Sequence, residues 1–202
     1  MFVVVEGIEG SGKSTLVGGL AERLRADGYN VTVTREPGGT ALGNSIREMF
    51  LDRDVTIAPL AEACLVNAAR AQHVADVIRP ALEAGRVVLC DRFTDSTLAY
   101  QGYGRGLDIG MLRGICDAAA EGIEPDLVLV LDVPVGVARA RLGARARAVD
   151  RIEAEGDAFH ERVRAGFLEL AKLPRHRLLD ATNDALSLVD AAFKAIFGAG
   201  VR

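Results

Sequence analysis

Four segments of the chain carry continuous or nearly continuous apolar runs, built mostly from valine and leucine. They span Phe2–Glu6, Val31–Arg35, Val87–Cys90 and Leu127–Asp132. Runs without regular polar alternation are typical of strands that are covered on both faces. A fifth and more polar segment, His176–Asp180, is also predicted to be a strand. The pattern therefore predicts five strands, the first four of them buried.

Between these segments, apolar residues recur every three or four positions, which is the spacing of a helix that buries one face. The first such helix is predicted to end at Gly28. A long helix is predicted from Pro59 to Ala84, with a kink at Pro80. The other helical stripes are Leu16, Leu20 and Leu24 in the first helix, Phe159, Val163, Phe167 and Leu170 after Gly156, and Leu186, Val189, Phe193 and Ile196 near the end.

Strands and helices alternate along the sequence, which predicts an α/β fold. In such a fold a parallel sheet is flanked by helices on both faces. The 202 residues contain no internal repeat, low-complexity tract or linker. We therefore expect a single domain over residues 1–202.

The first predicted strand leads directly into a complete phosphate-binding loop, Gly7–Ser14 (GIEGSGKS), and then into a helix. Backbone N–H groups of such a loop hold phosphates, Lys13 would reach the β- and γ-phosphates, and the Ser14 hydroxyl would hold Mg²⁺. A chance glycine-rich turn is the alternative. The pattern predicts a nucleoside triphosphate site made by Gly7, Ile8, Glu9, Gly10, Ser11, Gly12, Lys13, Ser14 and Thr15.

Charged residues follow the next two strands at the sheet edge where ligands bind in parallel α/β folds. The second strand ends in Arg35–Gly39 (REPGG), and the third ends in Asp91 and Arg92. A guanidinium binds phosphate oxygens in pairs, so Arg35 and Arg92 predict a site for a second phosphorylated ligand. Solvated loop charges are the alternative.

Two aspartates at strand ends receive different predictions. Asp91 is predicted to be the second acidic group near Mg²⁺, or to order the acceptor phosphate. Asp132 is predicted to cap the helix that opens at Pro134.

Five arginines crowd one short stretch among alanine and glycine: Arg139, Arg141, Arg145, Arg147 and Arg151. The stretch has little apolar mass to bury, so we predict a lid at about residues 143–156 that brings arginine to the transferred phosphoryl group. Arg145 and Arg147 are the leading candidates for catalysis. A solubilising basic helix face is the alternative.

The overall composition favours an intracellular enzyme. The net charge is −4, so we expect no nucleic-acid partner. No apolar run approaches the length of a membrane span, and Glu6 interrupts the first strand where a signal peptide would need apolar residues. Three cysteines without a CxxC pair (Cys64, Cys90 and Cys116) are predicted to be small core residues in a reducing compartment. We predict a cytoplasmic location.

Several segments together resemble the bacterial thymidylate kinases, P-loop kinases that transfer the γ-phosphoryl group of ATP to dTMP. The resemblance covers nearly the whole length. It rests on Glu6–Thr15, on residues 34–40 (TREPGGT), on Ala68–Arg70, on residues 91–102 (DRFTDSTLAYQG) and on residues 150–153 (DRIE). It implies a five-stranded parallel sheet, Mg²⁺ dependence, a homodimer and a role in making dTTP.

The resemblance also assigns an acceptor site. It places Glu9 at the deoxyribose 3′-hydroxyl, Arg35 and Arg92 at the dTMP phosphate, Arg70 at a thymine carbonyl, and Thr97 and Gln101 at the N3 edge. The dTMP-binding set that it implies is Glu9, Arg35, Glu36, Arg47, Val66, Arg70, Arg92, Thr97 and Gln101. The predicted catalytic residues are Lys13, Asp91, Arg92 and the two lid arginines Arg145 and Arg147. The predicted metal ligands are Ser14 and Asp91.

Val66 is a departure from the family, which usually has Phe there to stack on thymine. Valine offers apolar contact but no aromatic face, and stacking contributes about 1–3 kcal/mol per base. Either dTMP binds more weakly here, or Phe93 or another aromatic side chain compensates.

Two other classes of function remain open. One is a P-loop kinase for another nucleoside monophosphate, against which Arg35–Gly39, Thr97 and Gln101 argue. The other is a non-catalytic nucleotide-binding protein. The sequence has no Asn-Lys-x-Asp run of a GTPase switch, and it keeps Lys13 and Asp91, which a dead kinase would be expected to lose.

Overall fold

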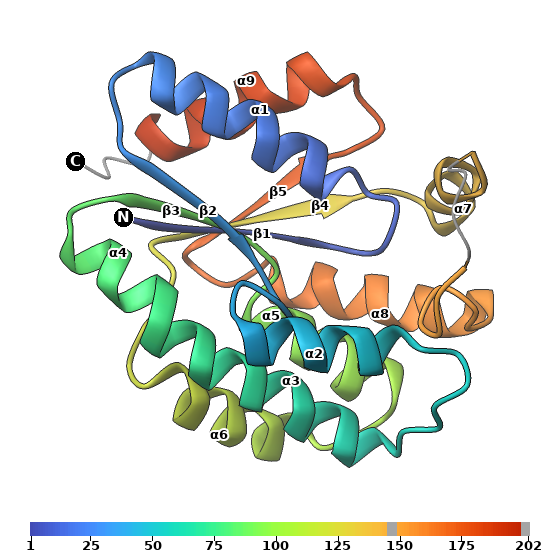
Figure 1. Cartoon of the computed structure of the whole chain (residues 1–202). Coiled ribbons are helices and arrows are strands. Elements are labelled where there is room, and N and C mark those ends of the chain that lie inside the picture. The colour runs from blue at the N-terminus through green and yellow to red at the C-terminus, as the bar shows by residue number, and fades with distance from the viewer. Residues whose placement is uncertain (145–148, 199–202) are drawn as a thin grey trace.

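The computed structural model describes residues 1–144 and 149–198 and contains a five-stranded, all-parallel sheet (Figure 1). The strand order is β2-β3-β1-β4-β5. The strands are β1 Phe2–Gly7, β2 Val31–Arg35, β3 Val87–Asp91, β4 Leu127–Asp132 and β5 His176–Asp180. All five predicted strands and the predicted α/β class are confirmed.

The strand register brings the predicted site residues to one edge of the sheet. Arg35 at the end of β2 lies opposite Asp91 of β3. Asp91 in turn lies opposite Val5 of β1, two residues before the phosphate-binding loop. Three neighbouring strands therefore end level with one another beside the loop.

Burial differs between the central and the edge strands. β1, β3 and β4 are almost fully buried, as predicted. β2 is not covered on both faces, because it lies at the edge of the sheet, and Val33 is 45% exposed. The prediction of a buried second strand is wrong in this respect. The core is built mainly around the three central strands.

Helices cover both faces of the sheet (Figure 1). α1 (Lys13–Ala26) and α9 (Ala185–Gly198) pack together on one face. The other face carries α2 (Ala41–Leu51), α3 (Pro59–His73), α4 (Arg79–Glu83), α5 (Thr94–Thr97), α6 (Ile109–Ala120) and α8 (Asp157–Leu170). α7 (Val135–Gly143) follows β4. None of the helices in the described part of the chain has the length and apolar content needed to cross a membrane.

The long helix predicted over Pro59–Ala84 is present but is interrupted by a π-helical turn, η1 (Val74–Ile78). The wide turn comes immediately before Pro80, which has no N–H to donate and whose ring crowds the carbonyl four residues back. The helix is therefore locally widened just before the position of the predicted kink.

Two other predictions need correction or extension. Cys64 is exposed on α3, whereas Cys90 and Cys116 are buried as predicted. The sequence patterns also missed α2 and α6, as well as a second π-helical segment, η2 (Leu98–Gly104), which continues α5. Thr97 and Gln101 lie on this α5–η2 segment.

Candidate active site

The phosphate-binding loop leaves backbone N–H groups available at the start of α1. The N-cap residue is Gly12 at φ 99°, and no side chain caps the helix. The loop also packs tightly against α7, because a Cβ at Gly10 would lie 2.4 Å from the Ala138 carbonyl oxygen. Glycine at this position therefore permits the close approach. An anion is the natural partner of such uncapped N–H groups.

Lys13 is held inside this loop. Its Nζ donates to the carbonyl oxygens of Gly7 (2.9 Å) and Ile8 (2.8 Å). Burial and then the like charge of Arg92 lower the pKa of Lys13 to about 8, against the opposing effect of nearby carboxylates. The ammonium group lies where an anionic phosphate would restore its charge balance.

Ser14 and Asp91 meet at the other side of the loop. The Ser14 Oγ donates to Asp91 Oδ2 at 2.9 Å, so a hydroxyl and a carboxylate from α1 and β3 are adjacent. Hard oxygen donors of this kind fit Mg²⁺, which usually takes one or two protein ligands and fills its other positions with phosphate oxygens and water. The residues present therefore fit the predicted metal.

Arg92 adopts a left-handed backbone conformation (φ 76°) at the end of β3. Such a conformation is costly for a residue other than glycine, and strained residues of this kind cluster at active sites and ligand clamps. Its guanidinium donates to Glu9 Oε1 (2.8 Å) and to Ser96 Oγ (3.0 Å), and lies over the Tyr100 ring. The turn thus aims Arg92 across the front of the loop.

Glu9 is anchored from two sides. Its carboxylate accepts from Arg92 and from the Tyr100 hydroxyl. Burial alone would raise the pKa of Glu9, but Arg92, Lys13 and the Tyr100 hydrogen bond together lower it. The side chain remains 18% exposed toward the cavity. An ionised acceptor is therefore presented beside the phosphate-binding loop.

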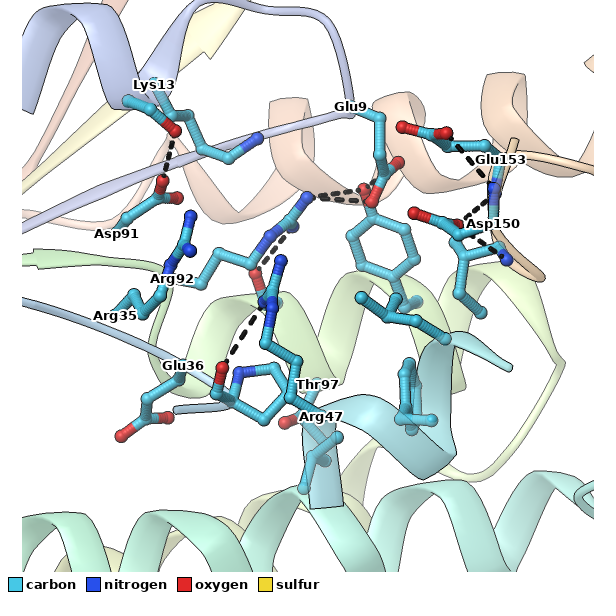
Figure 2. Close-up of a pocket in the computed structure, with 18 of the residues that line it drawn as sticks. Glu9, Lys13, Arg35, Glu36, Arg47, Asp91, Arg92, Thr97, Asp150 and Glu153 are labelled. Carbon is cyan, nitrogen blue, oxygen red and sulfur yellow. Dashed lines mark hydrogen bonds and ion pairs between the residues drawn. The ribbon is translucent and has the colours of Figure 1, made fainter. Parts of the chain in front are cut away.

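Arg35, Arg47 and Arg92 gather in front of this edge of the sheet, and Figure 2 shows their guanidinium groups turned toward the same space. Arg47 comes from α2 and donates to the Pro37 carbonyl oxygen (3.3 Å). Burial, Arg35 and then Arg92 lower the pKa of Arg47. Within residues 1–144 and 149–198, no carboxylate forms a salt bridge with Arg35 or Arg47. Two of the three guanidinium groups therefore have no ion-pair partner among these residues, although Asp91 and Asp150 lie near enough to oppose the lowering of the Arg47 pKa.

The far wall is built around Arg70 of α3, which is 1% exposed. Its Nε donates to Glu36 (2.8 Å), and its Nη2 donates to Thr97 (3.1 Å) and to the Phe93 carbonyl oxygen (2.9 Å). Glu36 is also bonded to His73 (3.0 Å). This network is buried and fixes the polar groups of the wall before any ligand arrives.

All nine residues of the predicted dTMP-binding set line one cavity of about 400 Å³. Lys13, Ser14 and Asp91 line it too. A second cavity of about 250 Å³ lies behind the loop and is lined by Gly10, Ser11, Gly12, Thr15, Leu16, Arg141, Ala181, Asn183, Ala185 and Leu188. Two cavities therefore meet at the phosphate-binding loop.

Comparison with known proteins identifies the family to which this chain belongs. A family model described as Thymidylate kinase matches residues 5–192. The chain belongs to the thymidylate kinase family. It is 54% identical to the thymidylate kinase of Desulfovibrio desulfuricans over 191 residues (90% of this chain, 88% of that one) and 50% identical to that of Pseudomonas putida over 199 residues (97% and 95%).

The fold of the chain is also that of a solved thymidylate kinase. The crystal structure of the enzyme from Ehrlichia chaffeensis superposes with a TM-score of 0.78 at 32% identity and covers 97% of this chain and 98% of that one. The resemblance to thymidylate kinases is therefore confirmed over nearly the whole chain.

The described arginines of the predicted lid already have protein partners. Arg139 donates to the Glu155 carbonyl oxygen (2.7 Å), and Arg141 donates to the Ala181 carbonyl oxygen (2.9 Å). Arg151 is bonded to Glu62. Arg145 and Arg147, the two predicted catalytic arginines, lie outside the described residues. Four residues in or next to the predicted lid do line the cavity: Leu142, Asp150, Ile152 and Glu153.

Asp132 does not cap the helix after β4. The N-cap residue of α7 is Pro134, and no side chain caps that helix. The Asp132 carboxylate instead accepts two hydrogen bonds from Arg164 of α8, at 2.7 and 3.0 Å. A bidentate charged pair holds it away from the helix start. The predicted capping role is wrong.

Sequence reasoning also missed Glu6, which is fully buried beneath the site. Its carboxylate accepts from the Phe93 N–H (2.8 Å), the Ser96 N–H (3.2 Å) and the Ser96 Oγ (2.6 Å). Burial and then Asp95 raise its pKa to about 7. The sequence feature that could have revealed it is a single acidic residue inside a strand of valines. Its carboxylate holds the turn that carries Arg92.

Proposed function

We propose that this chain transfers the γ-phosphoryl group of ATP to dTMP, giving ADP and dTDP, and so supplies dTTP synthesis in the cytoplasm. The observation that carries the proposal is the group of three arginines beside the phosphate-binding loop. Among the described residues, Arg92 forms a salt bridge with Glu9 whereas Arg35 and Arg47 form none, and all three lie next to a loop built for phosphates. A second phosphorylated substrate would balance this charge.

ATP is assigned to the loop and to the cavity behind it. The loop N–H groups and Lys13 bind the β- and γ-phosphates, and the nucleoside extends toward Arg141 and Asn183. Lys13 faces the charge that shifts during transfer and so stabilises the transition state more than the ground state. Ser14 and Asp91 would hold Mg²⁺, which neutralises phosphate charge when it is bound.

dTMP is assigned to the larger cavity. Its phosphate lies among the three arginines, and its sugar lies beside the Glu9 carboxylate, which accepts from a hydroxyl. The base lies against the wall that contains Val66 and Arg70. This placement directs the acceptor phosphate at the γ-phosphate across the loop, which is the positioning that phosphoryl transfer requires.

A coupled ADP-release assay with dTMP, dUMP, dCMP, AMP and thymidine tests the proposal. We expect turnover to be highest with dTMP and absent with thymidine, which has no phosphate for the arginines. Equal turnover with AMP would instead favour a kinase for another nucleoside monophosphate. ATP binding without turnover on any acceptor would favour the non-catalytic alternative.

Substitution of one arginine locates the acceptor. Arg35→Gln should raise the KM for dTMP by about tenfold or more while the KM for ATP changes little, because a charged hydrogen bond to phosphate contributes about 1.5–3 kcal/mol. Arg53→Gln, at an exposed position before α3, is the matched control and should behave like the wild type. Equal changes in the KM values for dTMP and ATP would show that Arg35 does not bind dTMP selectively.

A further inference from the structure

Glu62 of α3 is a buried carboxylate, 1% exposed, that no part of the proposed chemistry uses. Its Oε2 accepts from Gln101 Nε2 (3.1 Å) and from Arg105 Nε (3.2 Å). Its Oε1 accepts from Arg105 Nη2 (3.1 Å) and from Arg151 Nη1. Four donor groups from three residues therefore hold this one carboxylate, next to the Gln101 side chain that lines the larger cavity.

The contact with Glu62 fixes which way round the Gln101 side-chain amide sits. An ionised carboxylate only accepts hydrogen bonds, so the NH₂ group of Gln101 must face it and the amide oxygen must face away. Gln101 lines the larger cavity and is 3% exposed. No donor among the described residues reaches its Oε1. This oxygen is also not one of the fully buried polar atoms that lack a partner, so it is open to the cavity. Gln101 therefore offers an acceptor to the ligand.

We propose that Glu62 is a specificity-determining positioning residue, which locks Gln101 as a hydrogen-bond acceptor and so selects pyrimidines that carry an N3–H. This inference rests on the proposed function and adds the reason for its base preference. Thymine and uracil have an N3–H that donates to the amide oxygen. Cytosine has a bare N3 lone pair, which would face that oxygen with no proton between them.

Arg105 and Arg151 hold the Glu62 carboxylate in place and so fix the orientation of the Gln101 amide. For cytosine to bind, Gln101 would have to turn its NH₂ group into the cavity and place its oxygen against the Glu62 carboxylate. Glu62 cannot rotate away, because Arg105 is bonded to both of its oxygens and Arg151 to one. Arg105 is itself held by Glu155. Two acceptors would then be buried face to face, which is costly away from water.

The decisive experiment compares kcat/KM for dTMP, dUMP and dCMP in the wild type and in Glu62→Gln. A glutamine at position 62 presents either an oxygen or an NH₂ group, so Gln101 is free to turn over. We expect the ratio of dTMP to dCMP to fall by about tenfold or more, the size of one mispaired buried hydrogen bond. The ratio of dTMP to dUMP should stay unchanged, because both bases carry N3–H. A merely structural role would lower all three values together.

Three further variants sharpen the test. Glu155→Gln loses a partner of Arg105 but keeps the contact between Glu62 and Gln101, so its dTMP to dCMP ratio should equal that of the wild type. Glu62→Asp keeps the charge for both arginines but withdraws from Gln101, and should lower the ratio even if Glu62→Gln fails to fold. The exchange Glu62→Gln with Gln101→Glu returns an acceptor-only group to the cavity and should restore the preference for N3–H.

Two outcomes overturn the proposal. One is an unchanged dTMP to dCMP ratio in both Glu62 variants, and the other is an equal fall of that ratio in Glu155→Gln. Failure of the proposed function is distinguishable, because it would show first as a wild type that does not phosphorylate dTMP.

Discussion

Lys13 is held by two carbonyl oxygens of its own loop, an arrangement that keeps its charge in place before any phosphate binds. Lys13→Ala should leave a folded protein whose kcat falls by about 10²–10³ or more, because the transferred phosphate loses a preorganised countercharge. Steady-state turnover measures this. Lys172→Ala, an exposed lysine paired with Glu169, is the control and should keep its activity. Near-normal kcat in Lys13→Ala would reject the role of the loop.

Glu6 makes the free energy of unfolding depend on pH. Its pKa is about 7 in the folded protein and 4.5 as its ordinary value, so the folded state binds the extra proton between these values. The stability that Glu6 contributes is therefore complete below about pH 4.5 and is lost as the pH rises through about 7. Glu6→Gln should remove this slope, because Gln can still accept from the Phe93 N–H and can donate to the Ser96 Oγ.

Chemical denaturation at about pH 5 and about pH 8 measures the effect of Glu6. The wild type should lose about 1–3 kcal/mol more than Glu6→Gln between the two values. Equal pH dependence in the two proteins would show that Glu6 does not take up a proton in this range.

Val66 lines the larger cavity at the position where relatives are expected to carry Phe. If thymine lies against α3, Val66→Phe should lower the KM for dTMP by about fivefold or more, because a ring restores a stacking contact. Leu65→Phe, the neighbouring position on α3, which does not line the cavity, should have no such effect. A higher KM in Val66→Phe would show that another ring, such as that of Phe50, already occupies the space.

At the scale of elements, the central strands were readable from sequence because each is one continuous apolar run. α2 and α6 were not, since their cues lie in single caps. Thr40 accepts from the Gly43 N–H at the start of α2, and Asp108 accepts from the Met111 N–H at the start of α6. The π-helical turn before Pro80 leaves no periodic signature either. Such local choices are settled by packing and capping rather than by hydrophobic pattern.

The candidate site divides in the same way. The strand ends and the loop could be placed from sequence because parallel strands deliver their C-terminal residues to one edge. Glu6, Glu62 and Tyr100 could not, because each gains its role from a partner about 30 or more positions away. A buried polar side chain has no local pattern that announces its partner.

Contacts made by three of the five arginines reduce the number of candidates for the catalytic arginine of the lid. Arg139, Arg141 and Arg151 are engaged by the protein, which leaves Arg145 and Arg147 as the candidates for contact with the transferred phosphoryl group. Replacing both with Ala should lower kcat by about 10³ or more, because an arginine that stabilises the transferring phosphoryl group is worth about 10³–10⁵ in rate. The affinity for dTMP, measured without ATP, should stay nearly unchanged.

Hydrogen exchange gives an independent reading of the lid. The segment should become protected only when both substrates or a bisubstrate mimic are bound. Slow exchange in the free enzyme, or an unchanged kcat in the double variant, would show that Arg145 and Arg147 are only solvated surface charges and take no part in catalysis.

At the scale of the whole molecule, α3 exposes a stripe of small side chains on the side away from the sheet. Ala61, Cys64 and Ala68 of α3 are exposed, as is Ala75 of the π-helical turn η1 that follows, and α2 and α6 pack alongside α3. Such a face suits close helix contact with a second copy, in keeping with the homodimer that the family resemblance implies.

Sedimentation of the wild type should therefore give twice the 21.4 kDa chain mass. Ala68→Glu should give a monomer, because a charge would be buried without a partner at the contact. Ala26→Glu, on α1 at the opposite face of the sheet, should remain a dimer. A monomeric wild type would reject the assignment.

The strand order has a consequence for how this enzyme can change over evolutionary time. β1 lies between β3 and β4, and the two cavities draw their walls from opposite sides of it. Apart from the loop and four residues between 142 and 153, the larger cavity is built from residues 35–101. The smaller one takes its remaining wall from Thr15 and Leu16 of α1, from Arg141 and from residues 181–188. A recombination event that exchanged the first stretch between relatives would transfer acceptor preference as a block and leave the ATP side inherited intact.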